Sequence, residues 1–302
     1  MSVKVQDLTK IYGIQKAIDH ISFDIAEGAI VGLLGPNGAG KSTTMKILTG
    51  FIPQSSGNAW VHGHDVGVDS LEVRRLTGYL PESNPLYTDM YVKEYLHYVA
   101  GFYKIARTEA RVKEMIDITG LGIEQHKKIG QLSKGYRQRV GLAQAMIHDP
   151  KVLILDEPTS GLDPNQLVDI RKLITEIGKQ KTIILSTHIM QEVEAMCERV
   201  IIINRGKMVA NDSVAQLQKK TGAASVQVEF SASVEIGLLK KLPGIVEVRN
   251  EGGNRWVVSG TAKTDIRKLL FDFAVQKQLT VLSLNQRENS LEEVFRELTR
   301  KK

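Results

Sequence analysis

The chain has 302 residues, of which 42% are hydrophobic and 25% charged, as expected for a globular protein of one large domain or two smaller ones. Its net charge is +6, but the basic residues are spread thinly, so we expect no nucleic-acid partner. One cysteine excludes an internal disulfide, and the apolar runs are too short to span a bilayer, so a membrane role requires a partner.

Strands that alternate with helices dominate the first two thirds of the chain. Residues 29–34 are continuously apolar, as in a buried central strand, and the glycine-rich turn after them opens a helix near Lys41. Helical stretches such as 166–177 separate the strands, an order that predicts a mainly parallel α/β sheet. The expected strands are 3–7, 21–25, 29–34, 152–155, 182–185 and 200–203.

The pattern changes twice along the chain. Residues 89–128 lack strand signals, and we expect a helical subdomain over about 89–145 within a first domain of residues 1–215. Around residues 216–224 the α/β pattern breaks, and a second, smaller domain of residues 222–302 follows.

The second domain has a β-α-β-β-α-β order, which predicts the ferredoxin-like arrangement of a small α+β domain. Its two middle strands form a hairpin across residues 251–254, whose sequence EGGN favours a turn. A final helix carries Leu291, Val294, Phe295 and Leu298 at helical spacing. The elements expected before it are strand 225–230, helix 236–242, strands 245–250 and 255–259, helix 265–276 and strand 280–285.

Residues 35–42 read GPNGAGKS and fit the phosphate-binding loop G-x-x-x-x-G-K-[ST]. Its glycines let successive backbone N–H groups point at phosphates, next to a helix N-terminus. Lys41 is expected to reach the β- and γ-phosphates, and the Ser42 hydroxyl to bind Mg²⁺. A chance glycine-rich turn is the alternative, but a buried strand precedes the loop and a helix follows it. The nucleotide-binding candidates here are Gly35, Pro36, Asn37, Gly38, Ala39, Gly40, Lys41, Ser42 and Thr43.

Acidic and basic candidates follow two other predicted strands. Asp156 and Glu157 end the strand that starts at Val152, at the edge where ligands bind in open α/β sheets. We expect Asp156 to hold Mg²⁺ through water and Glu157 to polarise the attacking water. His188 follows strand 182–185 and is expected to contact the γ-phosphate. Without the phosphate loop, all three would be interpreted as ordinary structural residues.

The motifs together resemble the ATP-binding subunit of ABC transporters. The resemblance covers residues 1 to about 215, and its middle element, LSKGY, sets this class apart from other phosphate-loop proteins. It rests on these elements, in this order: 35–43 (GPNGAGKST), 132–136 (LSKGY), 152–157 (VLILDE), 160–163 (SGLD) and His188.

The resemblance implies a head-to-tail homodimer that encloses two ATP molecules, with Mg²⁺, and hydrolyses them. Tyr12 would stack on adenine. Ser133 and Gly135 would contact the γ-phosphate held by the opposite chain, Asp163 would couple the two sites, and His188 would steady the attacking geometry. The partner would be an integral membrane permease, with this chain in the cytoplasm, peripheral on the inner face of the cell membrane.

Two departures from the family pattern stand in this sequence. The usual signature is Leu-Ser-Gly-Gly-Gln, but Lys134 replaces one of its two glycines and Tyr136 replaces its glutamine. Glu82 stands where a glutamine usually senses the γ-phosphate and Mg²⁺. A carboxylate can still bind Mg²⁺, but its charge opposes the γ-phosphate. Together with residues 290–295 (SLEEVF), these departures resemble the ABC-2 branch of exporters.

The stretch 78–96 (GYLPESNPLYTDMYVKEYL) is most similar to ATPases associated with bacterial gliding motility. Tyrosines concentrate in and after it, and they either pack the core of the helical subdomain or form a groove for a cytoplasmic helix of the permease. Alanine at Tyr87 or Tyr91 distinguishes the two, because a groove predicts weaker binding of the permease and a packing role predicts loss of folding. The tyrosines are Tyr87, Tyr91, Tyr95, Tyr98 and Tyr103.

The preferred hypothesis is therefore an ATPase that powers an ABC-2-type exporter. A soluble ABC ATPase of DNA repair or translation is the alternative, but such proteins carry paired ATPase halves, long coiled coils or zinc modules. A nucleotide-gated scaffold without turnover is a third class, and the presence of Glu157 and His188 argues against it.

Overall fold

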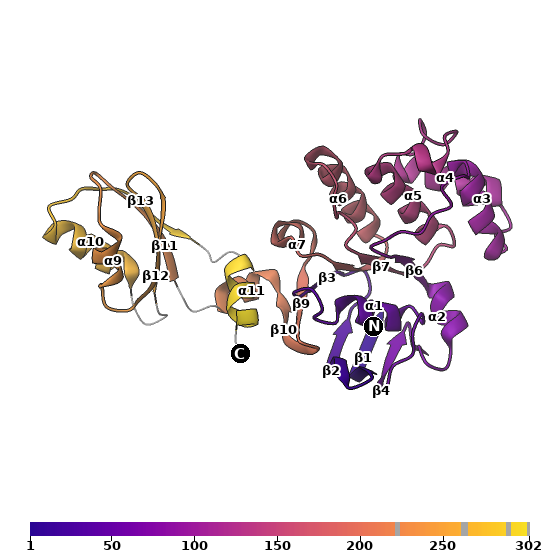
Figure 1. The fold of residues 1–302 in the computed structure, drawn as a ribbon, viewed down its shortest axis with the longest axis horizontal. Helices are drawn as coiled ribbons and strands as arrows, with labels where there is room; N and C mark the ends of the chain where they lie inside the picture. Colours follow the sequence, from indigo (N-terminus) through magenta and orange to yellow (C-terminus); the bar gives the residue numbers. More distant parts are fainter. Residues whose placement is uncertain (221–223, 261–264, 288–290, 301–302) are drawn as a thin grey trace. The chain divides into compact units, whose positions relative to one another are not determined.

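The computed structural model describes residues 1–220, 224–260, 265–287 and 291–300 (Figure 1). The chain divides into two compact units, Met1–Ser213 and Val214–Lys302. Each unit has its own cluster of buried apolar side chains. Among the described residues, no helix is both long and apolar enough to cross a bilayer.

A six-stranded sheet with strand order β10-β9-β3-β8-β7-β6 forms the centre of the first unit. The strands pair in parallel except at β10, which runs antiparallel to β9. Strands β3, β7 and β8 are buried at every residue, because helices cover both faces, and this explains their continuous apolar sequences. The strands are β3 (Ile30–Leu34), β6 (Thr77–Leu80), β7 (Val152–Asp156), β8 (Thr182–Ser186), β9 (Arg199–Asn204) and β10 (Lys207–Ser213).

A second, antiparallel sheet has the order β2-β1-β4-β5. Its first two strands form a long hairpin, so the predicted strands 3–7 and 21–25 were too short. The alternation of apolar and polar residues breaks because the pairing shifts register along β1, where Asp7 takes a left-handed backbone conformation with φ 49°. The strands are β1 (Val3–Tyr12), β2 (Gln15–Ile25), β4 (Ser56–Val61) and β5 (His64–Asp65).

The helices of the first unit lie on both sides of the six-stranded sheet (Figure 1). Helix α1 contacts β2 and β4 of one sheet and β7 of the other, so it lies between the two sheets. Helices α3, α4 and α5 pack against one another within residues 89–146. The helices are α1 (Lys41–Leu48), α2 (Ser70–Leu76), α3 (Val92–Phe102), α4 (Thr108–Thr119), the 3-10 turn η1 (Ile129–Gln131), α5 (Lys134–Met146), α6 (Pro164–Gly178) and α7 (Met190–Met196).

The second unit contains an antiparallel sheet with order β12-β13-β11-β14. Numbered within the unit, this order is 2-3-1-4, the ferredoxin-like arrangement that the sequence predicts. Helices α9 and α10 connect the strands, and the rings of Phe230 and Phe273 meet edge to face in the core, 6.1 Å apart. The elements are β11 (Ala224–Phe230), α9 (Ile236–Lys240), β12 (Ile245–Gly252), β13 (Arg255–Gly260), α10 (Ile266–Gln276) and β14 (Val281–Arg287).

The junction between the units differs from the sequence-based expectation. A break was predicted over residues 216–224, but helix α8 (Val214–Lys220) occupies the start of that stretch. Its packing partner is the final helix α11 (Leu291–Arg300), and no local pattern could reveal a contact between segments so far apart in sequence. Residues 221–223 and Ser290, the first residue of SLEEVF, lie outside the described residues.

Candidate nucleotide site

The loop between β3 and α1 has the backbone geometry of a phosphate-binding turn. Gly38 and Gly40 have φ of 77° and 111°, which residues with a side chain rarely adopt. A side chain on Gly35 would collide with the carbonyl oxygen of Ile203, and one on Gly40 with that of Ala17. The glycines are therefore required by the close approach of neighbouring strands as well as by the turn.

Lys41 begins helix α1 directly after this loop and is buried, with 7% of its surface exposed. Its ammonium donates hydrogen bonds to the carbonyl oxygens of Gly35 (2.7 Å) and Pro36 (3.3 Å), so it lies inside the turn. Burial lowers the pKa of Lys41, and the charges of Glu157, Asp156 and Glu82 oppose that shift. These carboxylates act on the ammonium through space, so the sheet brings the predicted cation and the predicted acids together.

Asp156 and Glu157 lie at the carboxyl end of β7. Ser186, at the end of β8, forms a hydrogen bond with each of these two residues. The Ser186 hydroxyl donates to a carboxylate oxygen of Asp156 at 2.6 Å and accepts from the backbone N–H of Glu157 at 2.9 Å. Asp156 is 3% exposed and Glu157 8%. Sequence reasoning missed Ser186, although its position at the end of a parallel strand beside the acidic pair was a usable signal.

Glu157 and His188 contact each other directly. His188 Nδ1 lies 2.8 Å from Glu157 Oε2, and the imidazole is 60% exposed whereas the carboxylate is 10% exposed. Glu157 has a left-handed backbone with φ 50°, a strained conformation for a residue with a side chain. The bond to Ser186 fixes the backbone of Glu157 and the contact with His188 holds its carboxylate, while the imidazole remains accessible.

Three further polar side chains connect the same two loops, and the sequence did not single them out. Thr159 follows Glu157 in the β7–α6 loop, and Thr187 precedes His188 in the β8–α7 loop. Both hydroxyls donate to Oε2 of Glu192 at 2.7 Å. Glu192, in helix α7, is completely buried.

The LSKGY motif begins helix α5. Ser133 is its N-cap, and the Ser133 hydroxyl accepts a long hydrogen bond of 3.4 Å from the backbone N–H of Tyr136. The Gln166 side chain of helix α6 lies directly over Gly135, so that glycine leaves room for it. Asp163 is the N-cap of α6 and accepts from the backbone N–H groups of Asn165 and Gln166. The start of α5 therefore packs against the start of α6 in the same chain.

The two remaining candidates lie at the rim. Tyr12, at the end of β1, is 51% exposed, and the Lys10 ammonium lies 5.1 Å from its ring centre. Glu82 follows β6 and is exposed, and its charge reaches Lys41 as noted above.

The residues fit a magnesium-bound nucleoside triphosphate. Hydroxyl and carboxylate oxygens, here from Ser42, Asp156 and Glu82, are the ligands that Mg²⁺ prefers. The loop supplies backbone N–H groups and a buried ammonium for phosphate oxygens. The fold and the site thus define a phosphate-loop nucleotide-binding protein.

Comparisons with known proteins narrow this class. A family model described as "ABC transporter" matches residues 18–160, and one described as "ATP-binding protein DrrA1-3-like, C-terminal domain" matches residues 213–299. The bacitracin transport ATP-binding protein of Bacillus licheniformis is 35% identical over 97% of this chain and 95% of its own. The linearmycin resistance ATP-binding protein of Bacillus subtilis is 30% identical over 98% of both chains.

Solved structures agree with the sequence comparisons. A dimeric ATP-binding cassette bound to ADP and phosphate has a TM-score of 0.64 and 25% identity, and the match covers 70% of this chain and 98% of the cassette. A subunit of an ABC transporter complex from Clostridium perfringens has a TM-score of 0.66 and 29% identity, over 72% of this chain and 90% of the subunit. The chain therefore belongs to the ATP-binding subunits of ABC transporters, a family of ATPases.

Proposed function

We propose that this chain is the ATP-hydrolysing subunit of an ABC-2-type exporter, attached to an integral membrane permease at the inner face of the cell membrane. The observation that carries the proposal is the arrangement around Glu157. Its nearly buried carboxylate is held by His188, its backbone N–H is held by Ser186, and its charge reaches the phosphate-loop ammonium of Lys41. Such an arrangement serves hydrolysis rather than passive binding of a nucleotide.

In this proposal the phosphate loop binds ATP through its backbone N–H groups, and Lys41 neutralises phosphate charge. Ser42 and Asp156, with Glu82 at the rim, hold Mg²⁺, which supplies charge stabilisation to the phosphates when bound. Thr43 stands in the first turn of α1, beside the loop. Tyr12 offers an exposed ring to the adenine base.

Glu157 acts as the general base that orients and polarises the attacking water. Its second contact, His188, holds the carboxylate and presents an exposed imidazole to the γ-phosphate. A base fixed in this way loses little freedom when the reaction begins, so its orientation contributes to the rate.

Ser133 and Gly135 act on the nucleotide of a second copy of this chain. They lie at the start of α5, where the Gln166 side chain of α6 covers Gly135 and Ser133 caps its own helix, which favours a role toward a second chain in a homodimer that closes around ATP. Asp163, as the N-cap of α6, joins the same packed region, so a shift at one nucleotide can be transmitted to the other.

The permease is proposed to bind at two neighbouring hollows beside the helical region. One, of about 680 Å³, includes Pro81, Ser83 and Asn84, the residues that flank Glu82. A ligand in this hollow would therefore contact the segment that carries Glu82. Binding at the hollow and events at the γ-phosphate would be linked through that short segment.

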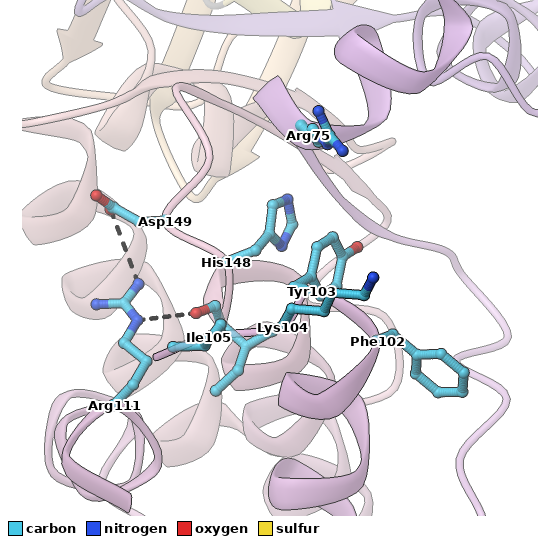
Figure 2. A pocket seen from close by; sticks show the side chains of 9 residues that line it. Arg75, Phe102, Tyr103, Lys104, Ile105, Arg111, His148 and Asp149 are labelled. Carbon is cyan, nitrogen blue, oxygen red and sulfur yellow. Dashed lines mark hydrogen bonds and ion pairs between the residues drawn. The ribbon is translucent and has the colours of Figure 1, made fainter. Parts of the chain in front are cut away.

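The other hollow, of about 610 Å³, is shown in Figure 2, and the two share Tyr103 and His148. The rings of these residues stack 4.0 Å apart, nearly parallel. Burial lowers the pKa of His148 to about 4, so its imidazole is neutral at pH 7 and offers a flat, uncharged surface. Phe102 is 68% exposed at the edge. Stacked aromatic rings beside an exposed phenyl group form a surface that can bind the apolar face of an amphipathic cytoplasmic helix.

Tyr103, one of the five tyrosines named from the sequence, lines both hollows. Tyr87 packs edge to face against Tyr95 and Tyr98 and is still 57% exposed. The ring of Tyr98 also meets that of Phe102, 4.9 Å away, so Tyr87 and Phe102 belong to one aromatic cluster. We therefore extend the proposed groove from Tyr87 to Phe102 and Tyr103.

The names of relatives bear on the class of cargo. Two of them are named for bacitracin transport and for linearmycin resistance, which favours export of a drug-like compound. The link to gliding motility rests only on the string at 78–96 and stays a prediction. A soluble role in DNA repair or translation has no specific observation in its favour.

Replacement of Phe102 by alanine tests the attachment to the membrane. We expect the variant to bind and hydrolyse ATP as the wild type does, but to lose co-purification with its integral membrane partner from solubilised membranes. Phe271→Ala, which removes a similarly exposed ring (56%) from the second unit, is the matched control. Retention of the permease by Phe102→Ala would contradict the proposed docking surface.

A further inference from the structure

The carboxylate of Glu192 is completely buried in the first unit, yet the hydrolytic scheme above does not use it. It lies in the short helix α7, which follows His188. Burying a carboxylate costs several kcal/mol unless its oxygens are well bonded, and an apolar residue of similar size is often more stabilising. The role of the buried Glu192 carboxylate is therefore to be found in the groups that it binds.

The partners of Glu192 come from two different loops. Its Oε2 accepts hydrogen bonds from the hydroxyls of Thr159 and Thr187, both at 2.7 Å. Its Oε1 lies 3.6 Å from Nη2 of Arg171 on α6, an ion pair that balances the buried charge. One oxygen thus joins the β7–α6 loop to the β8–α7 loop.

The side chains at the end of β8 alternate in direction. Ser186 bonds Asp156, Thr187 bonds Glu192, and His188 bonds Glu157. Because Thr187 lies between Ser186 and His188 just after β8, fixing Thr187 also restrains the backbone of its two neighbours. Thr187 Oγ1 in addition accepts from the backbone N–H of Ile189 at 3.1 Å, which holds the chain just beyond His188.

The second hydrogen bond to Glu192, from Thr159, restrains the β7–α6 loop that follows Glu157. Thr159 lies two residues after Glu157 and just before the SGLD segment that ends at Asp163. Its bond to Glu192 ties this loop to the one that carries His188. The catalytic carboxylate and the imidazole are therefore connected twice, once directly and once through Glu192.

We propose that Glu192 is a positioning residue of the hydrolytic site. One oxygen of Glu192 binds the hydroxyls of Thr159 and Thr187, and this link holds the His188 imidazole and the Glu157 carboxylate in their relative positions. This inference rests on the proposed function of Glu157. It assigns no contact with ATP to Glu192. A misplacement of catalytic groups by about 1 Å can lower a rate on the order of 100-fold, so the link has a measurable effect.

Thr187→Val tests the proposal, because valine keeps the shape of threonine and removes only the hydroxyl. With the full-length protein and Mg-ATP, we expect kcat to fall about 10-fold to 100-fold while KM for ATP stays within about twofold. Thr187→Ser restores the hydroxyl and should restore kcat. Adding Thr187→Val to Glu192→Ala should cause no further loss, because both changes remove the same link.

Thr119→Val is the matched control. Thr119 is completely buried and donates a 2.6 Å hydrogen bond to the carbonyl oxygen of Met115 in α4, remote from the site in sequence and element. It should lower thermal stability about as much as Thr187→Val does, without lowering kcat. A kcat within twofold of wild type in Thr187→Val, or an equal loss of kcat in Thr119→Val, overturns the proposal. Loss of turnover in Glu157→Gln alongside either result would leave the proposed function standing.

Discussion

The two units of this chain differ in what they bury. In the first unit, Lys41, Asp156, Glu157 and Glu192 are all less than 10% exposed and lie at or next to the nucleotide site, on β7, helices α1 and α7 and the loop after β7. In the described part of the second unit, by contrast, the fully buried side chains are apolar. Buried charges reduce stability unless they are paired, so their concentration in one unit marks where chemistry takes place.

The core of the second unit is apolar. Phe230, Trp256 and Phe273 fill the space between its sheet and helices. This contrast supports the proposal that ATP chemistry takes place in the first unit and that the second unit has a supporting role. Each prediction below tests one side of that division.

Glu157→Gln should have the largest effect, because it removes the base and keeps its size. We expect ATP hydrolysis to fall about 100-fold or more, with ATP binding retained. The variant should also accumulate as an ATP-dependent dimer in size-exclusion chromatography. Glu124→Gln is the matched control, since Glu124 is a buried carboxylate that pairs with Lys127 in the helical region. A monomeric Glu157→Gln protein in saturating ATP contradicts the assignment.

Glu82→Gln should have a smaller effect of opposite sign. Burial lowers the pKa of Lys41 and the charge of Glu82 is among those that oppose this shift, so the same charge also acts on phosphate oxygens bound there. Removal of that charge should raise ATP turnover a few-fold, or weaken its stimulation by the permease. Steady-state ATPase assays with and without the permease measure both effects. Unchanged turnover and unchanged stimulation by the permease would contradict the proposed effect of the Glu82 charge.

Trp256→Ala should leave the chemistry unchanged while it damages the second unit. Trp256 is 5% exposed, and loss of such a ring costs about 3–5 kcal/mol in unfolding free energy. Thermal unfolding should show an early transition for residues 214–302, and ATP hydrolysis at lower temperature should stay within about twofold of wild type. A parallel loss of ATPase activity would show that the units are not independent.

Local patterns in the sequence predicted most of the framework. Continuous apolar runs marked β3, β7, β8 and β9, and turn residues marked the β12–β13 hairpin, because burial on both faces and left-handed turns leave direct traces in composition. Strands β1 and β2 were underestimated because bulges interrupt their alternation.

The site was predicted only in part, for a physical reason. Lys41, Asp156 and Glu157 belong to short motifs with fixed spacing. The roles of Thr159, Thr187 and Glu192 depend on one oxygen that joins two loops, and no local pattern records such a contact. The same holds for the proposed groove, because the ring contacts that place Tyr87, Tyr98 and Phe102 together are set by the tertiary fold.

The central claim is that each nucleotide site is completed by a second copy of this chain. Mixing two inactive variants tests it directly: Glu157→Gln removes the base from a chain's own site, and Ser133→Arg blocks the surface that it offers to its partner. A mixed dimer contains one intact site, in which the Glu157 of one chain faces the Ser133 of the other. The account predicts that ATP hydrolysis reappears on mixing. Absence of activity in the mixture, with both proteins folded and able to bind ATP, would contradict it.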